Sequence, residues 1–150
     1  MNSIIQFSKW FFKLSNQGKI KQISKGEQQC SKILKELYPH HEFKTSRPNF
    51  MRNPMTGRNL ELDLYNAELK LAIEYNGIQH YMFSKYFHRT ESDFLKQKSR
   101  DKLKKRLCRK HGVKLIVVPY TIPFNNIKTF IIKEINSSNK DTQSKQCIII

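Results

Sequence analysis

Cysteine, acidic residues and long apolar runs are all scarce in this sequence. The three cysteines, Cys30, Cys108 and Cys147, are an odd number without Cys-x-x-Cys spacing, which argues against a disulfide framework or a structural zinc site. No apolar run approaches the ~20 residues that span a bilayer, and the N-terminus lacks the cationic start and small-residue cleavage site of a signal peptide. We therefore expect a soluble, intracellular protein with reduced thiols and no membrane span.

The shortage of acidic residues leaves a large positive charge. There are 12 Asp and Glu residues against 28 Lys and Arg residues, which gives a formal charge of +16. Such an excess repels the compact state unless a polyanion neutralises it. A nucleic acid is the leading candidate, and charge alone does not separate DNA from RNA.

The chain is long enough for one compact domain, because 38% of its 150 residues are hydrophobic. We expect that domain at 26–135. Residues 1–25 comprise an amphipathic helix at 3–15 and a polar connector, and the aromatic face of this helix also permits membrane-surface binding. Residues 136–150 are rich in Ser, Asn, Lys and Gln, so we expect a disordered tail. Its last four residues, from Cys147, fit the C-a-a-X form of a prenylation signal, although an unordered apolar end is the plainer interpretation.

Apolar periodicity and helix-stopping residues predict the elements of the domain. We expect, in order, a helix at 26–38, a possible strand at 41–46, a basic loop to 59, strands at 60–65 and 69–76, a charged helix at 91–111 with leucines 95, 103 and 107 on one side, a buried strand at 113–119 and a short helix at 125–135.

Two cationic segments are candidates for holding a nucleic-acid backbone. The loop supplies Lys44, Arg47, Arg52 and Arg58. The long helix carries nine Lys and Arg side chains against three carboxylates, and its candidates are Lys98, Arg100, Lys102 and Lys105. Phe50 and Met51 lie among the loop cations, where they can act as a wedge or base stack, or Phe50 can tuck into the core.

The two strands at 60–65 and 69–76 are expected to form a hairpin that gathers acidic side chains. The expected register pairs Tyr65 with Lys70, Asp63 with Ala72 and Glu61 with Glu74. Glu61, Asp63 and Glu74 would then share one face, where opposed like charges repel by about 3 kcal/mol at ~5 Å separation. A Mg²⁺ ion offsets this repulsion naturally, and Lys70 on the same face is the alternative.

Glu74 continues into Tyr-Asn-Gly-Ile-Gln79-His80, where a strand ends at a glycine and an amide and an imidazole follow. His80 can act as a general base near neutral pH. The parts for metal-assisted phosphodiester hydrolysis are therefore close in sequence. The other histidines, at 40, 41, 88 and 111, are interpreted as structural, and Glu27 alone would only favour the dipole of its helix.

These motifs resemble one branch of a known nuclease superfamily. Gly26-Glu27, Leu-Glu-Leu-Asp63, Ile-Glu74-Tyr-Asn-Gly-Ile-Gln-His80, Arg-Asp101-Lys and Leu-Ile-Val-Val-Pro-Tyr120 are similar to the very-short-patch-repair-like branch of the PD-(D/E)xK nucleases, which includes phage-type homing endonucleases and relatives in large DNA viruses. The resemblance covers about 26–122. It implies an α/β restriction-endonuclease-like core, in which helices flank a mixed central sheet and a metal lies at the sheet edge.

The resemblance also implies roles for individual residues. Asp63 and Glu74 would hold Mg²⁺, for which Mn²⁺ can substitute. Glu27 would reach the metal or its water, His80 would match a histidine of some members, and Asp101 would support His80 or complete the site. Leu62 replaces the usual proline, and Asn76 replaces the common lysine, so that the lysine's role falls to Gln79 with His80 or to a helix lysine such as Lys102.

The expected function is Mg²⁺-dependent DNA endonuclease, with a homodimer possible and, for a viral protein, the nucleus or cytoplasm of the host cell as its location. A non-catalytic DNA-binding or packaging protein is the alternative, which Asn76 favours, and RNA cleavage or RNA binding is a third.

Overall fold

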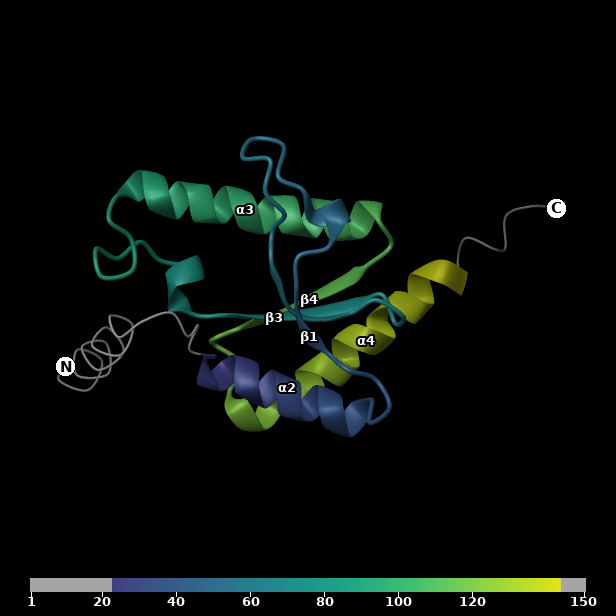
Figure 1. Ribbon diagram of the computed structural model, residues 1–150. Helices are drawn as coiled ribbons and strands as arrows, with labels where there is room; N and C mark the ends of the chain where they lie inside the picture. Colours follow the sequence, from purple (N-terminus) through teal and green to yellow (C-terminus); the bar gives the residue numbers. More distant parts are fainter. Residues whose placement is uncertain (1–22, 144–150) are drawn as a thin grey trace.

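The structure is a computed structural model that describes residues 23–143 (Figure 1). Its elements are α2 (Lys25–Leu37), β1 (Lys44–Ser46), η1 (Asn49–Met51), β2 (Leu62–Asn66), β3 (Leu71–Asn76), η2 (Ile78–His80), α3 (Glu91–Lys110), β4 (Lys114–Pro119), η3 (Phe124–Asn126) and α4 (Ile127–Gln143). The expected helix at 3–15 and the Cys147 motif lie outside the described residues.

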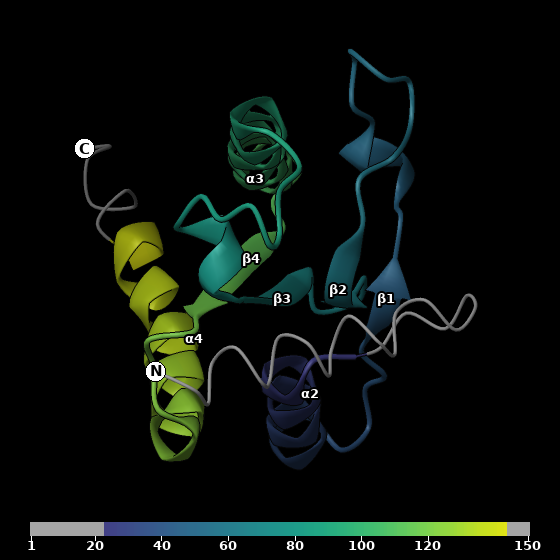
Figure 2. The same cartoon turned by 90° about the vertical axis from the view of Figure 1, so that its left-hand side faces the viewer.

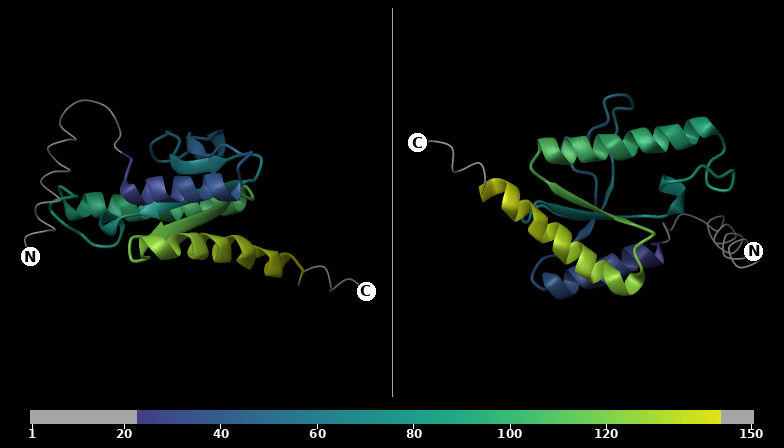
Figure 3. Two further views of the ribbon diagram at one scale, coloured as in Figure 1. Left: turned by 90° about the horizontal axis from the view of Figure 1, so that it is seen from below. Right: turned by 180° about the vertical axis from the view of Figure 1, so that it is seen from behind.

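A four-stranded mixed sheet forms the centre of the protein, in the order β1-β2-β3-β4. The β1/β2 and β2/β3 pairs are antiparallel, and β3/β4 is parallel. Figure 2 shows α3 on one face and α2 with α4 on the other, and Figure 3 shows α4 running obliquely past β4. The expected α/β class, with helices flanking a mixed sheet, is confirmed.

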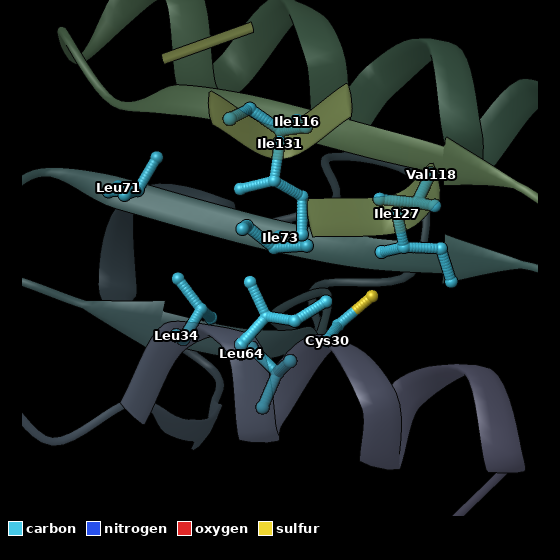
Figure 4. Packing of buried hydrophobic residues seen from close by; sticks show 10 residues of the cluster. Cys30, Leu34, Leu64, Leu71, Ile73, Ile116, Val118, Ile127 and Ile131 are labelled. Carbon is cyan, nitrogen blue, oxygen red and sulfur yellow. The ribbon is translucent and has the colours of Figure 1, made fainter. Parts of the chain in front are cut away.

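Each face of the sheet has its own hydrophobic cluster. The cluster beside α2 and α4 consists of Cys30, Ile33, Leu34, Leu64, Leu71, Ile73, Ile116, Val118, Ile127 and Ile131 (Figure 4). The smaller cluster beneath α3 consists of Met51, Leu62, Ala72, Cys108 and Val113. Full burial of a large apolar side chain contributes about 1.5–3 kcal/mol, so both helical layers are held to the sheet by their apolar residues.

The hairpin between β2 and β3 has a register that differs from the expected one by two residues. The observed pairs are Leu64 with Ile73, Tyr65 with Ala72 and Asn66 with Leu71. The Asn66 side chain explains the shift, because its Oδ1 accepts a bond from the Leu69 amide at 2.8 Å and its Nδ2 donates to the Glu42 carbonyl at 2.9 Å. Continued by one step, this register brings Asp63 opposite Glu74, in place of the Glu61 expected there.

A β-bulge interrupts β2 between Leu62 and Tyr65, the stretch that contains Asp63. In the pairing with β1, Lys44 faces Tyr65 and Ser46 faces Leu62, so β2 has one extra residue. Leu62 and Leu64 accordingly belong to clusters on opposite faces of the sheet, although they are two residues apart. Bulges re-aim side chains and are common beside active sites.

Two helices depart from expectation. In α3, Leu95 is 63% exposed, so it is not part of a buried leucine stripe. The buried residue of α3 is Cys108. Residues 136–143, expected to be disordered, continue α4, because extending an existing helix is far easier than nucleating one. Lys114 Nζ donates to the Glu134 and Ile135 carbonyls within this helix. Within residues 23–143, no helix combines the length and apolar character that crossing a bilayer requires.

Candidate active site

The carboxyl end of β3 is where the expected site residues meet other elements. Glu74 lies on β3, η2 with His80 follows at once, and α3 passes above. One stripe of α3 faces this region, because residues three and four apart in a helix share a face. The stripe contains Gln97, Asp101, Lys104 and Cys108, which contact His88, His80, Glu74 and Met51 respectively.

Glu74 is buried and paired with a lysine that the sequence did not identify. Its side chain is 4% exposed, and Lys104 Nζ donates to its Oε1 at 2.6 Å. Burial raises the pKa of Glu74, Lys104 lowers it, and the charges of Asp63 and Asp101 raise it further. Lys70 and Lys102 were the lysines expected near the acidic residues. Lys70 is instead exposed in the hairpin turn with φ 47°, and Lys102 is exposed on α3. The sequence signal that could have identified Lys104 is its spacing from Asp101 and Cys108, which puts the three residues on one face of α3.

Asp63 lies within the bulged stretch of β2 and acts electrostatically on both layers. Its charge raises the pKa of Glu74 on the α3 side. Its charge also raises the pKa of Cys30 on α2, where burial is the main cause, Glu27 the second, and the result is about 12. Glu27 and Asp63 therefore both act on Cys30, and Asp63 also acts on Glu74.

Glu27 lies near the carboxyl end of β3 because α2 packs unusually close to that strand. A Cβ atom at Gly26 would lie 2.3 Å from the Tyr75 ring, so only glycine permits the approach. Ser24 caps the helix, since its Oγ accepts a bond from the Glu27 amide at 3.1 Å. The Glu27 side chain is buried, which the helix dipole alone would not require.

His80 and Asp101 are in contact, which is one of the two placements that the resemblance implied for Asp101. His80 Nδ1 lies 2.9 Å from Asp101 Oδ2, and both side chains are about one-fifth exposed. Gln79 instead folds back over its own turn. Its side-chain amide lies so close to Gly77 that a Cβ atom added to this glycine would be within 3 Å of it. The structure therefore pairs the imidazole with a carboxylate but does not bring Gln79 to Glu74.

The connection between β1 and β2, residues 47–61, forms an arm that extends beside α3 (Figure 2). Glu61 belongs to this arm and binds Arg47 at 2.9 Å, and the hairpin register puts Asp63 opposite Glu74 in place of the expected Glu61. Met51 is fully buried and Phe50 packs on Tyr65 and His111. Of the two interpretations of Phe50, the structure therefore shows the packed one.

A hollow of about 590 Å³ lies between the arm and α3. Its lining consists of Arg47, Asn53, Thr56, Arg58, Asn59, Leu60, Glu61, Arg100 and Lys104. Four of these nine residues are cations and one is an anion. Because Lys104 also binds Glu74, the hollow adjoins the carboxylates. Lys98 lies elsewhere, 5.5 Å from the centres of the Tyr81 and Phe94 rings.

The remaining cationic candidates are not gathered into this hollow. Lys44 pairs with Glu42 at 3.6 Å. Arg52 is exposed on the arm, where its backbone pairs with Asn59, and Lys105 is exposed on α3.

The acidic residues offer hard oxygen ligands but do not form a closed metal cage. Among residues 23–143, no three or more His, Cys, Asp and Glu side chains are gathered in a way that could hold a metal ion. Mg²⁺ commonly uses only one or two carboxylates, with water and phosphate oxygens completing its shell. Asp63 and Glu74 are the pair whose chemistry and register fit that smaller requirement.

The chain is similar to several viral proteins, all named as uncharacterized. It is 45% identical over 108 residues to protein 033L of Invertebrate iridescent virus 3, covering 72% of the chain and 55% of that protein. It is 41% identical over 122 residues to protein 307L of Invertebrate iridescent virus 6, covering 72% and 61%. For protein 094L of Frog virus 3 (isolate Goorha), identity is 45% over 100 residues, covering 66% and 64%.

The chain thus spans less than two thirds of each of these relatives. No family model matches the chain, and no solved structure matches it.

Proposed function

We propose that this chain is a metal-dependent DNA endonuclease with a restriction-endonuclease-like core. The observation that carries the proposal is the hairpin register, which, continued by one step, brings Asp63 opposite the buried Glu74 at the end of β3. An imidazole–carboxylate pair and a cationic hollow adjoin the same point. Phosphodiester hydrolysis requires a polarised phosphate, a proton acceptor and positive charge for the transition state.

Asp63 and Glu74 are the proposed ligands of Mg²⁺, with Mn²⁺ as a substitute, and Glu27 is the proposed carboxylate that reaches a water molecule of the metal. When bound, the metal would polarise the phosphate and lower the pKa of a water molecule. The donor set suits a hard cation, because carboxylate oxygens are its preferred protein ligands. Asp63 lies within the bulged stretch of β2, and its charge acts on Cys30 of α2 as well as on Glu74 of β3.

His80 is the proposed general base, and Asp101 is the proposed positioning residue. The 2.9 Å contact between His80 Nδ1 and Asp101 Oδ2 leaves Nε2 as the ring nitrogen for proton transfer. A carboxylate in this position orients the imidazole and stabilises the imidazolium that forms when a proton is taken up.

Lys104 is the proposed source of the charge that the motif lysine would supply, a role expected for Gln79 with His80 or for a helix lysine such as Lys102. Lys104 bonds Glu74 and lines the hollow, so its ammonium can stabilise either the buried carboxylate or a phosphate. Asn76 stands where the resembling nucleases commonly have a lysine, and a cation from α3 supplies the missing charge at this end of the sheet.

The second candidate is a DNA-binding protein without turnover. The Lys104–Glu74 contact favours it, because an ion pair already neutralises Glu74 without a metal. The two candidates predict the same DNA binding and differ in cleavage.

The decisive experiment incubates supercoiled, linear and branched DNA with the wild type in Mg²⁺, in Mn²⁺ and in EDTA. Asp63→Asn and Glu74→Gln preserve shape, and Glu68→Gln is the matched control because Glu68 is exposed beside His41 and does not line the hollow. We expect metal-dependent cutting by the wild type and Glu68→Gln, and loss of cutting in the other two. His80→Ala should lower the rate by about 100-fold or more.

If no protein cuts any substrate while all bind DNA equally, the binding protein without turnover replaces the nuclease. If Asp63→Asn cuts at the wild-type rate, the assignment of the metal ligands is overturned.

A further inference from the structure

An exposed aromatic surface adjoins the proposed site, and the nuclease assignment gives it no role. We call it the aromatic platform, and it consists of Tyr81, Phe83, Phe94 and Tyr120. Tyr81, Phe83 and Tyr120 are each 37–41% exposed. Large aromatic side chains commonly occupy cores and interfaces, so a group of them at the surface indicates a binding function.

Contacts between the rings make the platform continuous. The Tyr81 and Tyr120 centroids are 5.6 Å apart, and those of Phe83 and Phe94 are 6.3 Å apart. Lys98 Nζ joins the two pairs, because it lies 5.5 Å from the centres of both Tyr81 and Phe94.

The segment that carries the platform is fixed to α3 by a buried histidine. His88 is 5% exposed, its Nε2 lies 2.8 Å from Gln97 Oε1, and its ring stacks on Phe83. Tyr81 packs separately against Tyr120, which directly follows β4. The rings are therefore positioned before any ligand arrives, which lowers the entropic cost of binding.

The platform also lies next to the proposed chemistry. Tyr81 directly follows His80, and Asp101 contributes to the raised pKa of Tyr81. A nucleotide whose phosphate reaches His80 therefore has its neighbouring base within reach of Tyr81 and Tyr120.

We infer that the aromatic platform stacks unpaired nucleobases of DNA, so that the preferred substrate contains a single-stranded segment beside the cleaved phosphate. This inference rests on the proposed function. Aromatic rings interleaved with cations are the usual construction of a single-strand binding surface, since every base offers a π face and the backbone needs positive charge. Lys98 among the rings and the formal charge of +16 favour this occupant over an apolar protein surface.

The test measures binding in EDTA, where a metal-dependent nuclease does not cut. Labelled single-stranded DNA, its blunt duplex and the duplex with a single-stranded overhang are titrated with the wild type, Tyr81→Leu, Tyr120→Leu and Tyr81→Phe. Phe124→Leu is the matched control, because Phe124 is 49% exposed at the start of η3, outside the platform. A fluorescent adenine analogue in the single strand reports stacking directly.

We expect each leucine variant of the platform to weaken binding of single-stranded and overhang DNA about tenfold. Binding of the blunt duplex should be unchanged, Tyr81→Phe and Phe124→Leu should match the wild type, and quenching of the analogue should be lost only in Tyr81→Leu and Tyr120→Leu.

Equal loss on duplex and single strand, or wild-type binding by both leucine variants, would overturn the inference. Because these measurements involve no cleavage, failure of the nuclease proposal leaves their outcome readable. A stacking surface without any cutting would place the platform on a DNA-binding protein.

Discussion

The Lys104–Glu74 contact is a buried ion pair, and breaking such a pair costs more than replacing both partners. Lys104→Met would leave the Glu74 carboxylate 4% exposed beside Asp63 and Asp101. Leaving one buried charge alone costs about 3–5 kcal/mol, whereas apolar replacement of both partners is often neutral. We therefore expect Lys104→Met to lower the free energy of unfolding by that amount in urea titrations, and a second change, Glu74→Leu, to restore most of it.

The pH dependence of this loss follows from the direction of the pKa shift. The pKa of Glu74 lies above its ordinary 4.5 in the folded protein, so stability falls as the pH rises from 4.5 through the raised pKa. Lys104 lowers the pKa of Glu74. In Lys104→Met this pKa is therefore higher, and the fall in stability extends to higher pH. The stability difference between wild type and Lys104→Met should grow from acidic to neutral pH. An equal difference at all pH values, or an equal loss in the exposed control Lys105→Met, would contradict this account.

At the scale of single residues, the contact between His80 and Asp101 was predicted only through the resemblance to the nuclease branch. The two residues are 21 positions apart, so local spacing does not reveal the contact. Lys104 was not identified, because nothing in the sequence orients α3 about its own axis. The orientation follows from Cys108 packing on Met51 of the arm, which is a tertiary contact between distant residues.

At the scale of elements, the arm and α3 form the cationic hollow together. Each phosphate contact contributes about −0.9 to the slope of log binding constant against log salt. We expect Arg58→Gln and Arg100→Gln each to make the duplex-binding slope less steep by about one, measured by fluorescence anisotropy over a salt series.

Arg109→Gln is the matched control for this series. Arg109 is in the last turn of α3 and does not line the hollow. An equal change of slope in all three variants would indicate diffuse attraction by the net charge, without a phosphate site in the hollow.

Apolar periodicity and stop residues were sufficient to predict the boundaries of several helices and strands, but not the hairpin register. α2, α3 and β4 begin and end within one residue of expectation, because Pro39, Gly112 and runs of apolar residues mark them. The hairpin register required the hydrogen bonds of the Asn66 side chain. The bulge in β2 depends on pairing with the short β1, which alternation within β2 cannot reveal.

At the scale of the whole molecule, the formal charge of +16 opposes the compact state. A polyanion that binds the folded form should raise the melting temperature. With duplex DNA at about 100 times its dissociation constant, the stabilisation is about 2.7 kcal/mol, or roughly 5–10 °C. We expect this shift in EDTA at low salt and its disappearance at high salt, with dextran as an uncharged control. An unchanged melting temperature at low salt would contradict DNA as the partner.

The polar stripe of α3 also limits how the length of this helix can vary. Gln97, Asp101 and Lys104 meet three different partners only because they point the same way. One residue inserted between Gln97 and Asp101 would rotate the two halves of the stripe by about 100° relative to each other. The number of residues in α3 is therefore constrained as strongly as their types. Insertions or deletions are tolerable only near the two ends of the helix.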